Sequence, residues 1–377
     1  MEEMLPGLRK YPHIFSPIMI GKLKVKNRVK YASTETNFNY RDGYVSDKEV
    51  GYMEAQARGG AGIVTTQGAY TDPRGEGRGY VGMMAIWDDK FIPGLKRLAD
   101  VIHKHGSASC LQLMHCGRVG SKLNLPAGAE LVAPSAIAMT GRIWTDSQGE
   151  QPYDQPREMT QKHVEQAIAE YALAAKNAVA AGLDGVEVHG ANGYLINQFL
   201  DPGSNQRSDA YGGDAARRNR FALDVAAAVI AKIGADRVGI RLSPYGVFND
   251  MSGNYDGIVD QYVALAAAAG GLGLAYLHLV DHSAMGAPKP EPTTVQAICQ
   301  AFRAAGGGTV ILSGGYDAER AEADLQSGAA DLIAFGRPFI ANPDLVARLQ
   351  SGKELAVPDQ TTFYSPGEAG YTDYPAL

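Results

Sequence analysis

Short apolar runs alternate with longer amphipathic stretches along most of this chain, and the alternation predicts parallel strands separated by helices. The apolar runs are rich in Val, Ile and Leu, as buried parallel strands usually are. They lie at Arg28–Ala32, Ala61–Thr65, Ala108–Met114, Gly185–Val188, Val238–Leu242, Ala275–Leu279, Thr309–Leu312 and Asp331–Ala334. Eight strands, each followed by a helix, favour a single α/β domain folded as a closed (β/α)8 TIM barrel.

The stretches between the strands carry helix-end signals. Ser46 and Glu49 form a Ser-x-x-Glu capping-box pattern, and Thr160 precedes a run of apolar residues at helical spacing. Asn342 followed by Pro343 predicts the start of the last helix. Further helices are expected at Ala215–Ile233, Tyr255–Gly270, Thr293–Ala305 and Ala318–Ser327.

Three segments fall outside the alternation. Residues 18–25 predict an N-terminal hairpin. Residues 115–159, after the third strand, form a loop that is too long to be a simple connection. We expect it to cross the active face and to contain a short hairpin near 131–144. The tail, 357–377, is expected to fold back onto the barrel, so that 1–377 is one domain.

Composition narrows the possible partners and the location. The formal charge is -6 and the pI is about 5.8, without a Lys/Arg cluster, so nucleic acid is not expected as a partner. Cys110, Cys116 and Cys299 are too few and too scattered for a disulfide framework or an iron–sulfur cluster. The N-terminus lacks a signal-peptide pattern, and no apolar run is long enough to span a membrane. We expect a cytoplasmic monomer or homodimer.

The stretch from Val186 to Leu200 concentrates polar side chains directly after the strand Gly185–Val188. His189 and Asn192 can both donate hydrogen bonds to one oxygen, and Tyr194 can donate a proton. At the carboxyl end of a parallel strand, such a set favours polarisation of a carbonyl with help from a general acid. A single histidine after a strand more often has a structural role, so this interpretation needs support from other strands.

Two other strands carry polar residues near their carboxyl ends. Gln112 lies on the third predicted strand and Arg241 on the fifth. A buried arginine in a barrel mouth requires an anion, because its desolvation is otherwise costly. For a lone arginine, that anion is usually a nearby carboxylate of the protein itself.

Glycine-rich turns after the last two strands favour a phosphate as the anion. Gly314 and Gly315 follow the seventh strand, and Gly336 and Arg337 follow the eighth. Barrels often build a phosphate site from these two loops, where glycines let backbone N–H groups approach the ligand. The sequence therefore predicts a phosphorylated cofactor across the barrel mouth.

The residues leave two classes of enzyme open. No spacing of His, Cys, Asp and Glu indicates a metal site, and no Gly-x-Gly-x-x-Gly motif followed by an acid indicates a dinucleotide-binding domain. The glycine-rich loops suit either an enzyme with a phosphorylated cofactor or a flavin-free lyase or isomerase that binds a sugar phosphate.

Longer motifs point to a family. They are Val186–Leu200, Ser204–Gly213, Asn219–Phe221, Gly239–Pro244, Ala334–Leu345 and Gly370–Pro375, together with Asn27, Arg28 and Gln112. In these segments, which cover most of the chain, the sequence resembles the Old Yellow Enzyme family of flavin-dependent ene-reductases.

The resemblance implies an FMN-dependent enzyme that takes electrons from NADPH or NADH and reduces a small activated alkene. Enones, enals, maleimides, nitroalkenes and nitrate esters are the expected substrates. His189 and Asn192 would bind the substrate carbonyl, and Tyr194 would supply the proton. The resemblance assigns FMN to Ala32, Ser33, Thr34, Gln67, Gln112, Arg241, Gly314, Gly315, Gly336 and Arg337, and the substrate to His189, Asn192, Met114 and Tyr364.

The N-terminal half departs from the better-known branch of this family. Glu35 takes the position of a flavin-binding Thr, and Met114 replaces a Trp. An ionised Glu35 beside a reduced flavin is unfavourable unless the side chain turns away or is protonated. Residues 27–118 resemble dienoyl-CoA and 2-enoate reductases, whereas residues 184–377 resemble the short single-domain branch. This division favours a recombined or engineered chain or an unusual subfamily. The Glu35 and Met114 departures keep enoyl thioesters and amines as alternative substrates.

Overall fold

Eight parallel strands close into a barrel, as the sequence predicts. The computed structural model describes residues 5–363 and 367–377. Hydrogen bonding joins the strands in the order β3-β15-β14-β13-β12-β11-β6-β4, and a pairing between β3 and β4 closes the circle. The barrel strands are β3 (Val29–Tyr31), β4 (Ile63–Tyr70), β6 (Ala108–Met114), β11 (Gly185–Gly190), β12 (Val238–Leu242), β13 (Tyr276–Val280), β14 (Thr309–Ser313) and β15 (Leu332–Phe335).

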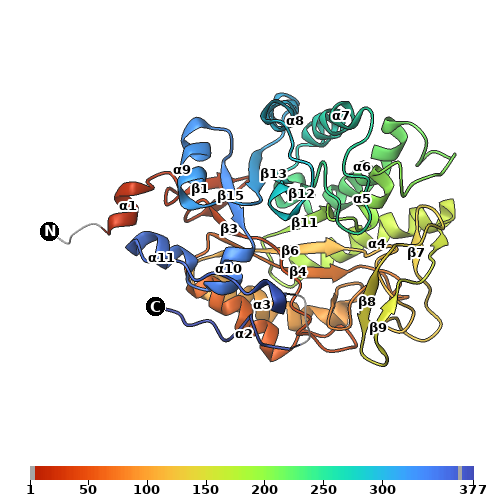
Figure 1. The fold of residues 1–377 in the computed structure, drawn as a ribbon, viewed down its shortest axis with the longest axis horizontal. Coiled ribbons are helices and arrows are strands. Elements are labelled where there is room, and N and C mark those ends of the chain that lie inside the picture. Colours follow the sequence, from red (N-terminus) through yellow and green to blue (C-terminus); the bar gives the residue numbers. More distant parts are fainter. Residues whose placement is uncertain (1–4, 364–366) are drawn as a thin grey trace.

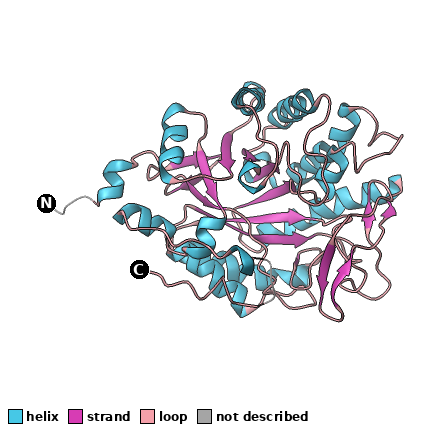
Figure 2. Ribbon diagram, viewed as in Figure 1, coloured by secondary structure: helices cyan, strands magenta, loops and turns pink. Residues whose placement is uncertain are grey.

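Helices surround the strands on the outside, which Figure 2 shows as cyan ribbons around the magenta arrows. Their apolar faces lie against the barrel and their polar faces meet solvent. The main helices are α2 (Asp47–Arg58), α3 (Ile92–Lys104), α4 (Gln161–Ala180), α6 (Ala215–Ile233), α7 (Ile258–Gly271), α8 (Pro292–Ala304) and α9 (Ala318–Ser327). Shorter helices are α1 (Pro6–Lys10), α5 (Leu195–Leu200), α10 (Arg337–Ala341) and α11 (Leu345–Ser351).

Short strands outside the barrel include the predicted N-terminal hairpin. There, β1 (Ile18–Ile20) pairs antiparallel with β2 (Leu23–Val25). The excursion after β6 holds a second hairpin, β8 (Arg142–Thr145) with β9 (Gly149–Pro152), and a parallel pair, β7 (Val132–Ala133) with β10 (Arg157–Glu158). In Figure 1 these four strands lie beyond the arrowheads of β4 and β6, at the carboxyl end of the barrel. A two-residue strand, β5 (Met84–Ala85), pairs with β4.

The excursion hairpin is therefore placed differently from the prediction near 131–144. The chain turns between Thr145 and Gly149, where Gly149 has a positive φ of 68° and Thr145 Oγ1 donates to the Gly149 carbonyl. Residues 132–133 pair instead with a strand from the far end of the excursion. That contact is distant in sequence, and the local pattern does not reveal it.

One predicted helix start is wrong and another is confirmed without its full capping box. Asn342 does not cap the last helix: α11 follows Asp344, and the Asn342 side chain donates to the Pro338 carbonyl and accepts from Ala356 N–H. Ser46 does cap α2 by accepting from Glu49 N–H at 3.2 Å. The Glu49 side chain, however, does not complete the capping box, because it accepts instead from the Thr36 hydroxyl.

No helix within the described ranges is both long and apolar enough to cross a membrane.

Candidate active site

A cavity of about 630 Å³ opens at the carboxyl ends of the barrel strands. Every strand of the barrel contributes lining residues from itself or from the loop that follows it. The lining includes most of the predicted site: Ala32, Ser33, Thr34, Gln112, Met114, His189, Asn192, Tyr194, Arg241, Gly314, Gly315, Gly336 and Arg337. The closed barrel thus brings together residues that are spread over some three hundred positions of sequence.

His189 and Asn192 present unsatisfied polar atoms in this cavity. His189 lies on β11 in register with Arg241 of β12, and it is 2% exposed. Its Nδ1 and the Asn192 Oδ1 are buried without a hydrogen-bond partner among the described residues. Because buried polar atoms are normally hydrogen-bonded, these atoms indicate that a polar ligand group belongs beside them.

The backbone at Asn192 holds its side chain in place. Asn192 has a positive φ of 61°, which asparagine tolerates better than most residues. Ser243 Oγ accepts a hydrogen bond from Asn192 N–H, and the Asn249 side chain donates to the Asn192 carbonyl. The loop after the neighbouring strand β12 therefore fixes this turn at two points.

The charge state of His189 suits hydrogen-bond donation rather than ion pairing. Burial and the nearby Arg241 guanidinium hold the pKa of His189 well below its usual range. The imidazole is therefore neutral at physiological pH, with one N–H donor and one acceptor nitrogen. A neutral donor can polarise a carbonyl without giving up its proton.

Tyr194 lies just before α5 and contacts a second tyrosine. Its hydroxyl is 2.8 Å from that of Tyr80, which comes from the loop after β4. Its ring centroid lies 5.2 Å from that of His189. Tyr80 was absent from the predicted site; no sequence feature marks it, because its contact with Tyr194 is formed only in the folded barrel.

A buried ion pair supports the floor of the cavity. Glu187 and Lys30 are completely buried inside the barrel, and Lys30 Nζ lies 2.7 Å from Glu187 Oε2. Burial alone would raise the pKa of Glu187, but Lys30 and His278 outweigh it and hold the pKa well below its usual range. Glu187 is therefore ionised and accepts hydrogen bonds from its neighbours.

One of these bonds fixes the orientation of the Gln112 amide. Gln112 Nε2 donates to Glu187 Oε1 at 2.9 Å. Since this side of the amide is occupied by the carboxylate, its oxygen is left to face the cavity as an acceptor. Sequence reasoning identified Gln112 but not Glu187 or Lys30, which lie 157 positions apart.

The glycines of the last two loops leave room for a ligand. Gly314 has a φ of 107°, and a Cβ added there would lie 1.9 Å from the Asp281 carbonyl oxygen, so only glycine fits. Gly336 differs: an added Cβ would meet only the Ala32 Cβ, at 3.9 Å, and would otherwise project into open space. Arg337 follows at the start of α10. This combination of open backbone and positive charge fits a phosphate.

One residue of the predicted site, Gln67, is not on the cavity wall, and another falls outside the described residues. Gln67 lies behind it, fully buried, and its side-chain N–H donates to Thr36 Oγ1 at 3.2 Å. Tyr364 lies outside the described residues. The wall also includes Glu35, which the sequence placed near the cofactor, and residues that sequence reasoning did not propose, among them Tyr80, His282 and Phe248.

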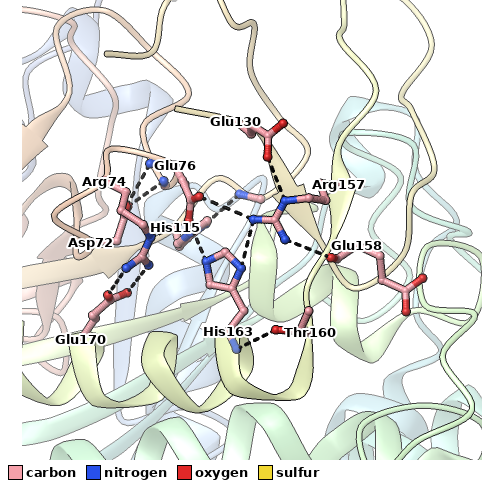
Figure 3. Close-up of polar contacts among 12 residues, drawn as sticks. Asp72, Arg74, Glu76, His115, Glu130, Arg157, Glu158, Thr160, His163 and Glu170 are labelled. Atoms are coloured by element: carbon pink, nitrogen blue, oxygen red, sulfur yellow. Dashed lines mark hydrogen bonds and ion pairs between the residues drawn. The ribbon is translucent and has the colours of Figure 1, made fainter. Parts of the chain in front are cut away.

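A charged network, drawn in Figure 3, anchors the loop after β4 at Arg74 and Glu76, a few positions before Tyr80. Glu76, on that loop, accepts from His163 of α4 at 2.8 Å and from Arg74 at 2.8 Å. Arg74 also forms a two-pronged ion pair with Glu170 of α4. Arg157, at the end of the excursion, lies 3.7 Å from Glu76. The network thus joins the loop after β4, the excursion and α4.

We expect Glu76 to make the fold sensitive to acid. Burial alone would raise the pKa of Glu76, but hydrogen bonds from His163 and Arg74 outweigh it and hold the pKa at about 2. Because the pKa of Glu76 in the folded protein lies below its unfolded-state value of about 4.5, the ionised carboxylate stabilises the fold at any pH above that value. This stabilisation is lost as the pH falls towards 2. The Glu76→Gln variant should therefore lose stability less steeply than the wild type between these pH values. Urea unfolding at a series of pH values measures this difference. Parallel plots of the free energy of unfolding against pH for the two proteins would contradict the role given to Glu76.

Comparisons with known proteins agree with this geometry. Residues 13–356 match the model of the NADH:flavin oxidoreductase / NADH oxidase family. The chain is 35% identical to a "probable flavin mononucleotide-dependent alkene reductase" of Leishmania infantum, over 97% of each chain.

Two solved structures show the same fold. Morphinone reductase in complex with tetrahydroNAD is 37% identical, with a TM-score of 0.87 over 97% of this chain and 98% of that one. The old yellow enzyme homologue from Zymomonas mobilis is 32% identical, with a TM-score of 0.88 over 97% of this chain and all of that one.

Proposed function

This chain belongs to the NADH:flavin oxidoreductase / NADH oxidase family, and we propose that His189, Asn192 and Tyr194 form the substrate site of its reaction. It is an Old Yellow Enzyme-type oxidoreductase that uses FMN and NAD(P)H to reduce activated C=C bonds. The flavin-free lyase or isomerase is not supported by the family match. The observation that carries the proposed site is the pair of unsatisfied polar residues, His189 and Asn192, in the same cavity as a tyrosine hydroxyl.

The cavity contains a suitable residue for each part of FMN. Gly314, Gly315, Gly336 and Arg337 would hold its phosphate, while Gln112 would accept a hydrogen bond from the ring system. When bound, FMN supplies hydride chemistry: it accepts a hydride from a nicotinamide coenzyme and delivers it to the β-carbon of the alkene. Arg241 would offer a positive charge to the ring system.

The remaining steps are performed by this chain's own side chains. His189 and Asn192 donate hydrogen bonds to the substrate's carbonyl or nitro oxygen, which draws electron density from the alkene. The donors would be a ring N–H of His189 and the Nδ2 amide of Asn192, since the Asn192 Oδ1 atom can only accept. Tyr194 supplies a proton to the α-carbon, and the Tyr80 hydroxyl stabilises the charge left on the Tyr194 oxygen.

A two-step anaerobic experiment tests this function. Protein loaded with FMN should bleach when NADPH or NADH is added, and its colour should return when cyclohexenone follows. Colour that returns with N-ethylmaleimide or a nitroalkene would extend the proposed substrate range to those compounds. Protein that cannot be loaded with FMN, or that bleaches and never regains its colour with any activated alkene, would refute the proposal.

We expect Gly336→Ala to weaken FMN binding without disturbing the fold. The added methyl group meets no protein atom closer than 3.9 Å, and the φ of −104° suits alanine. The methyl would instead occupy space proposed for the phosphate and should weaken FMN binding by about 10-fold or more. Fluorescence titration of the apoprotein measures this. Gly271→Ala, in open space on α7, is the matched control and should bind FMN normally.

The sequence-based expectations of a cytoplasmic location and of a monomer or homodimer remain part of this proposal. Light scattering of the holoenzyme would decide the oligomeric state. The preference between NADPH and NADH would follow from comparing the two bleaching rates.

A further inference from the structure

The turn that presents Asn192 to the cavity packs directly against the loop after β12. Asn192 and Gly193 both have positive φ, 61° and 76°. A Cβ added at Gly193 would lie 2.4 Å from the Phe248 carbonyl oxygen and 2.7 Å from the Asn249 Cβ. The position of the Asn192 turn therefore depends on the position of that loop.

The loop after β12 has an unfavourable backbone of its own. Asn249 and Asp250 adopt consecutive left-handed conformations, with φ of 57° and 56°. Residues with a side chain adopt this conformation at a cost and keep it only where the surroundings hold them. Asn249 is also the direct link to the site, because its Nδ2 donates to the Asn192 carbonyl at 2.8 Å. What holds Asn249 and Asp250 therefore also holds Asn192.

Arg118 binds the carbonyl groups of this pair. It lies at the start of the excursion after β6, is 3% exposed and is not among the residues that line the cavity. Its Nη2 donates to the Asn249 carbonyl at 3.2 Å and to the Asp250 carbonyl at 3.0 Å. Its Nη1 donates to the Ile137 carbonyl at 3.4 Å. The buried guanidinium is thus directed at backbone oxygens, which it holds from behind the cavity wall.

A second link joins Arg118 to the Asn192 turn. The Arg118 backbone N–H donates to Gln198 Oε1 at 3.2 Å, and Gln198 is completely buried on α5. Gln198 Nε2 in turn donates to the Gly193 carbonyl at 2.8 Å. Arg118 is therefore connected to two successive carbonyls of the turn, at Asn192 through Asn249 and at Gly193 through Gln198.

We propose that Arg118 is a positioning residue, which holds Asn249 and Asp250 in their left-handed conformation and so keeps the Asn192 amide directed at the substrate's oxygen. This inference rests on the proposed function, since Asn192 binds substrate only in that reaction. A hydrogen bond weakens steeply when its donor is misdirected, and a misplacement of about 1 Å can slow a reaction greatly. Arg118 therefore acts on the reaction through Asn192, without lining the cavity.

A double-variant cycle on the FMN-loaded protein tests this role. Arg118→Met keeps a long side chain but removes every side-chain donor. It should lower the second-order rate constant for reoxidation by cyclohexenone by about 10-fold, the effect of one hydrogen bond. Asn192→Gly removes the amide that Arg118 positions, and glycine tolerates the positive φ. In the Asn192→Gly background, Arg118→Met should change the rate constant by less than about 2-fold.

Asn249→Gly tests the same link closer to the site. Glycine adopts the left-handed conformation without strain, and the buried Arg118 guanidinium keeps its carbonyl partners. This variant should therefore fold even if Arg118→Met does not. It should slow reoxidation by cyclohexenone in the wild type and have little further effect in the Asn192→Gly background.

Arg207→Met is the matched control for the loss of a buried arginine. Arg207 is 7% exposed and also donates to backbone carbonyls, those of Pro134 and Met159. None of these three residues lines the cavity. Urea unfolding should show a loss of stability in Arg207→Met, whereas its rate constant for reoxidation should equal that of the wild type.

The outcomes separate this inference from the proposed function. FMN-loaded wild type that no activated alkene reoxidises, or an Asn192→Gly variant that reacts like the wild type, would overturn the proposed site and this inference with it. Wild-type reoxidation by Arg118→Met would overturn the role of Arg118 alone. An equal loss from Arg118→Met, or from Asn249→Gly, with and without the Asn192 amide would do the same, because a general disturbance of the fold does not depend on that amide.

Discussion

Replacing Tyr194 with phenylalanine is expected to slow reoxidation of the reduced enzyme by cyclohexenone by about 100-fold or more. Tyr194 would supply the proton that the α-carbon needs, and phenylalanine keeps the ring but has no proton to give. Reduction by NADPH should remain nearly unchanged, because that half of the cycle requires no proton from Tyr194. Stopped-flow absorbance measures the two halves separately.

Replacing Tyr80, whose hydroxyl contacts that of Tyr194, provides a matched comparison. Tyr80→Phe keeps the Tyr194 hydroxyl and removes only its hydrogen-bond partner at 2.8 Å. We expect this variant to slow reoxidation by about 10-fold, the effect of one hydrogen bond that matters in the transition state. If Tyr194→Phe slowed both halves of the cycle equally, its role as proton donor would be refuted.

Breaking the buried ion pair in the barrel interior should cause the largest loss of stability. Glu187→Gln would leave the Lys30 ammonium buried without its counter-ion, and this should lower the free energy of unfolding by about 3–5 kcal/mol. The affected pair is completely buried, with 2.7 Å between Lys30 Nζ and Glu187 Oε2. Urea unfolding of the apoprotein measures the loss.

A double variant separates the lost ion pair from a general disturbance of the core. Lys30→Met combined with Glu187→Gln removes both charges and keeps similar side-chain volumes, so it should recover much of the stability. FMN binding should stay weaker in the double variant, because Glu187 no longer fixes the Gln112 amide. If the double variant lost as much free energy of unfolding as Lys30→Met and Glu187→Gln together, the two residues would not be an energetically coupled pair.

The order of elements was largely predictable from the sequence because it depends on local pattern. Alternating apolar runs and amphipathic stretches predicted eight strands, and glycine turns were predicted after the last two of them. The predicted bounds of β6, α6, β12 and α9 agree with the structure. Strand ends were less predictable: β11 continues to Gly190 because His189 and Gly190 pair with β12, and that pairing is not visible in the local sequence.

Local pattern was insufficient where distant segments meet. The excursion pairs Val132–Ala133 with Arg157–Glu158, so its hairpin lies later than expected. Asn342 has the sequence of a helix cap, but its side chain is used to hold the segment around Ala356.

The sequence by itself determined the barrel, and it predicted that the glycine-rich turns and His189, Asn192 and Tyr194 would meet in one cavity, because each follows directly after a strand. Only the tertiary structure decided what surrounds them. The Tyr80 hydroxyl beside Tyr194, the Lys30–Glu187 pair beneath Gln112 and the buried environment of Glu35 all depend on side chains from distant strands. Their charge states depend on burial and on neighbours in space, and the closed barrel creates both.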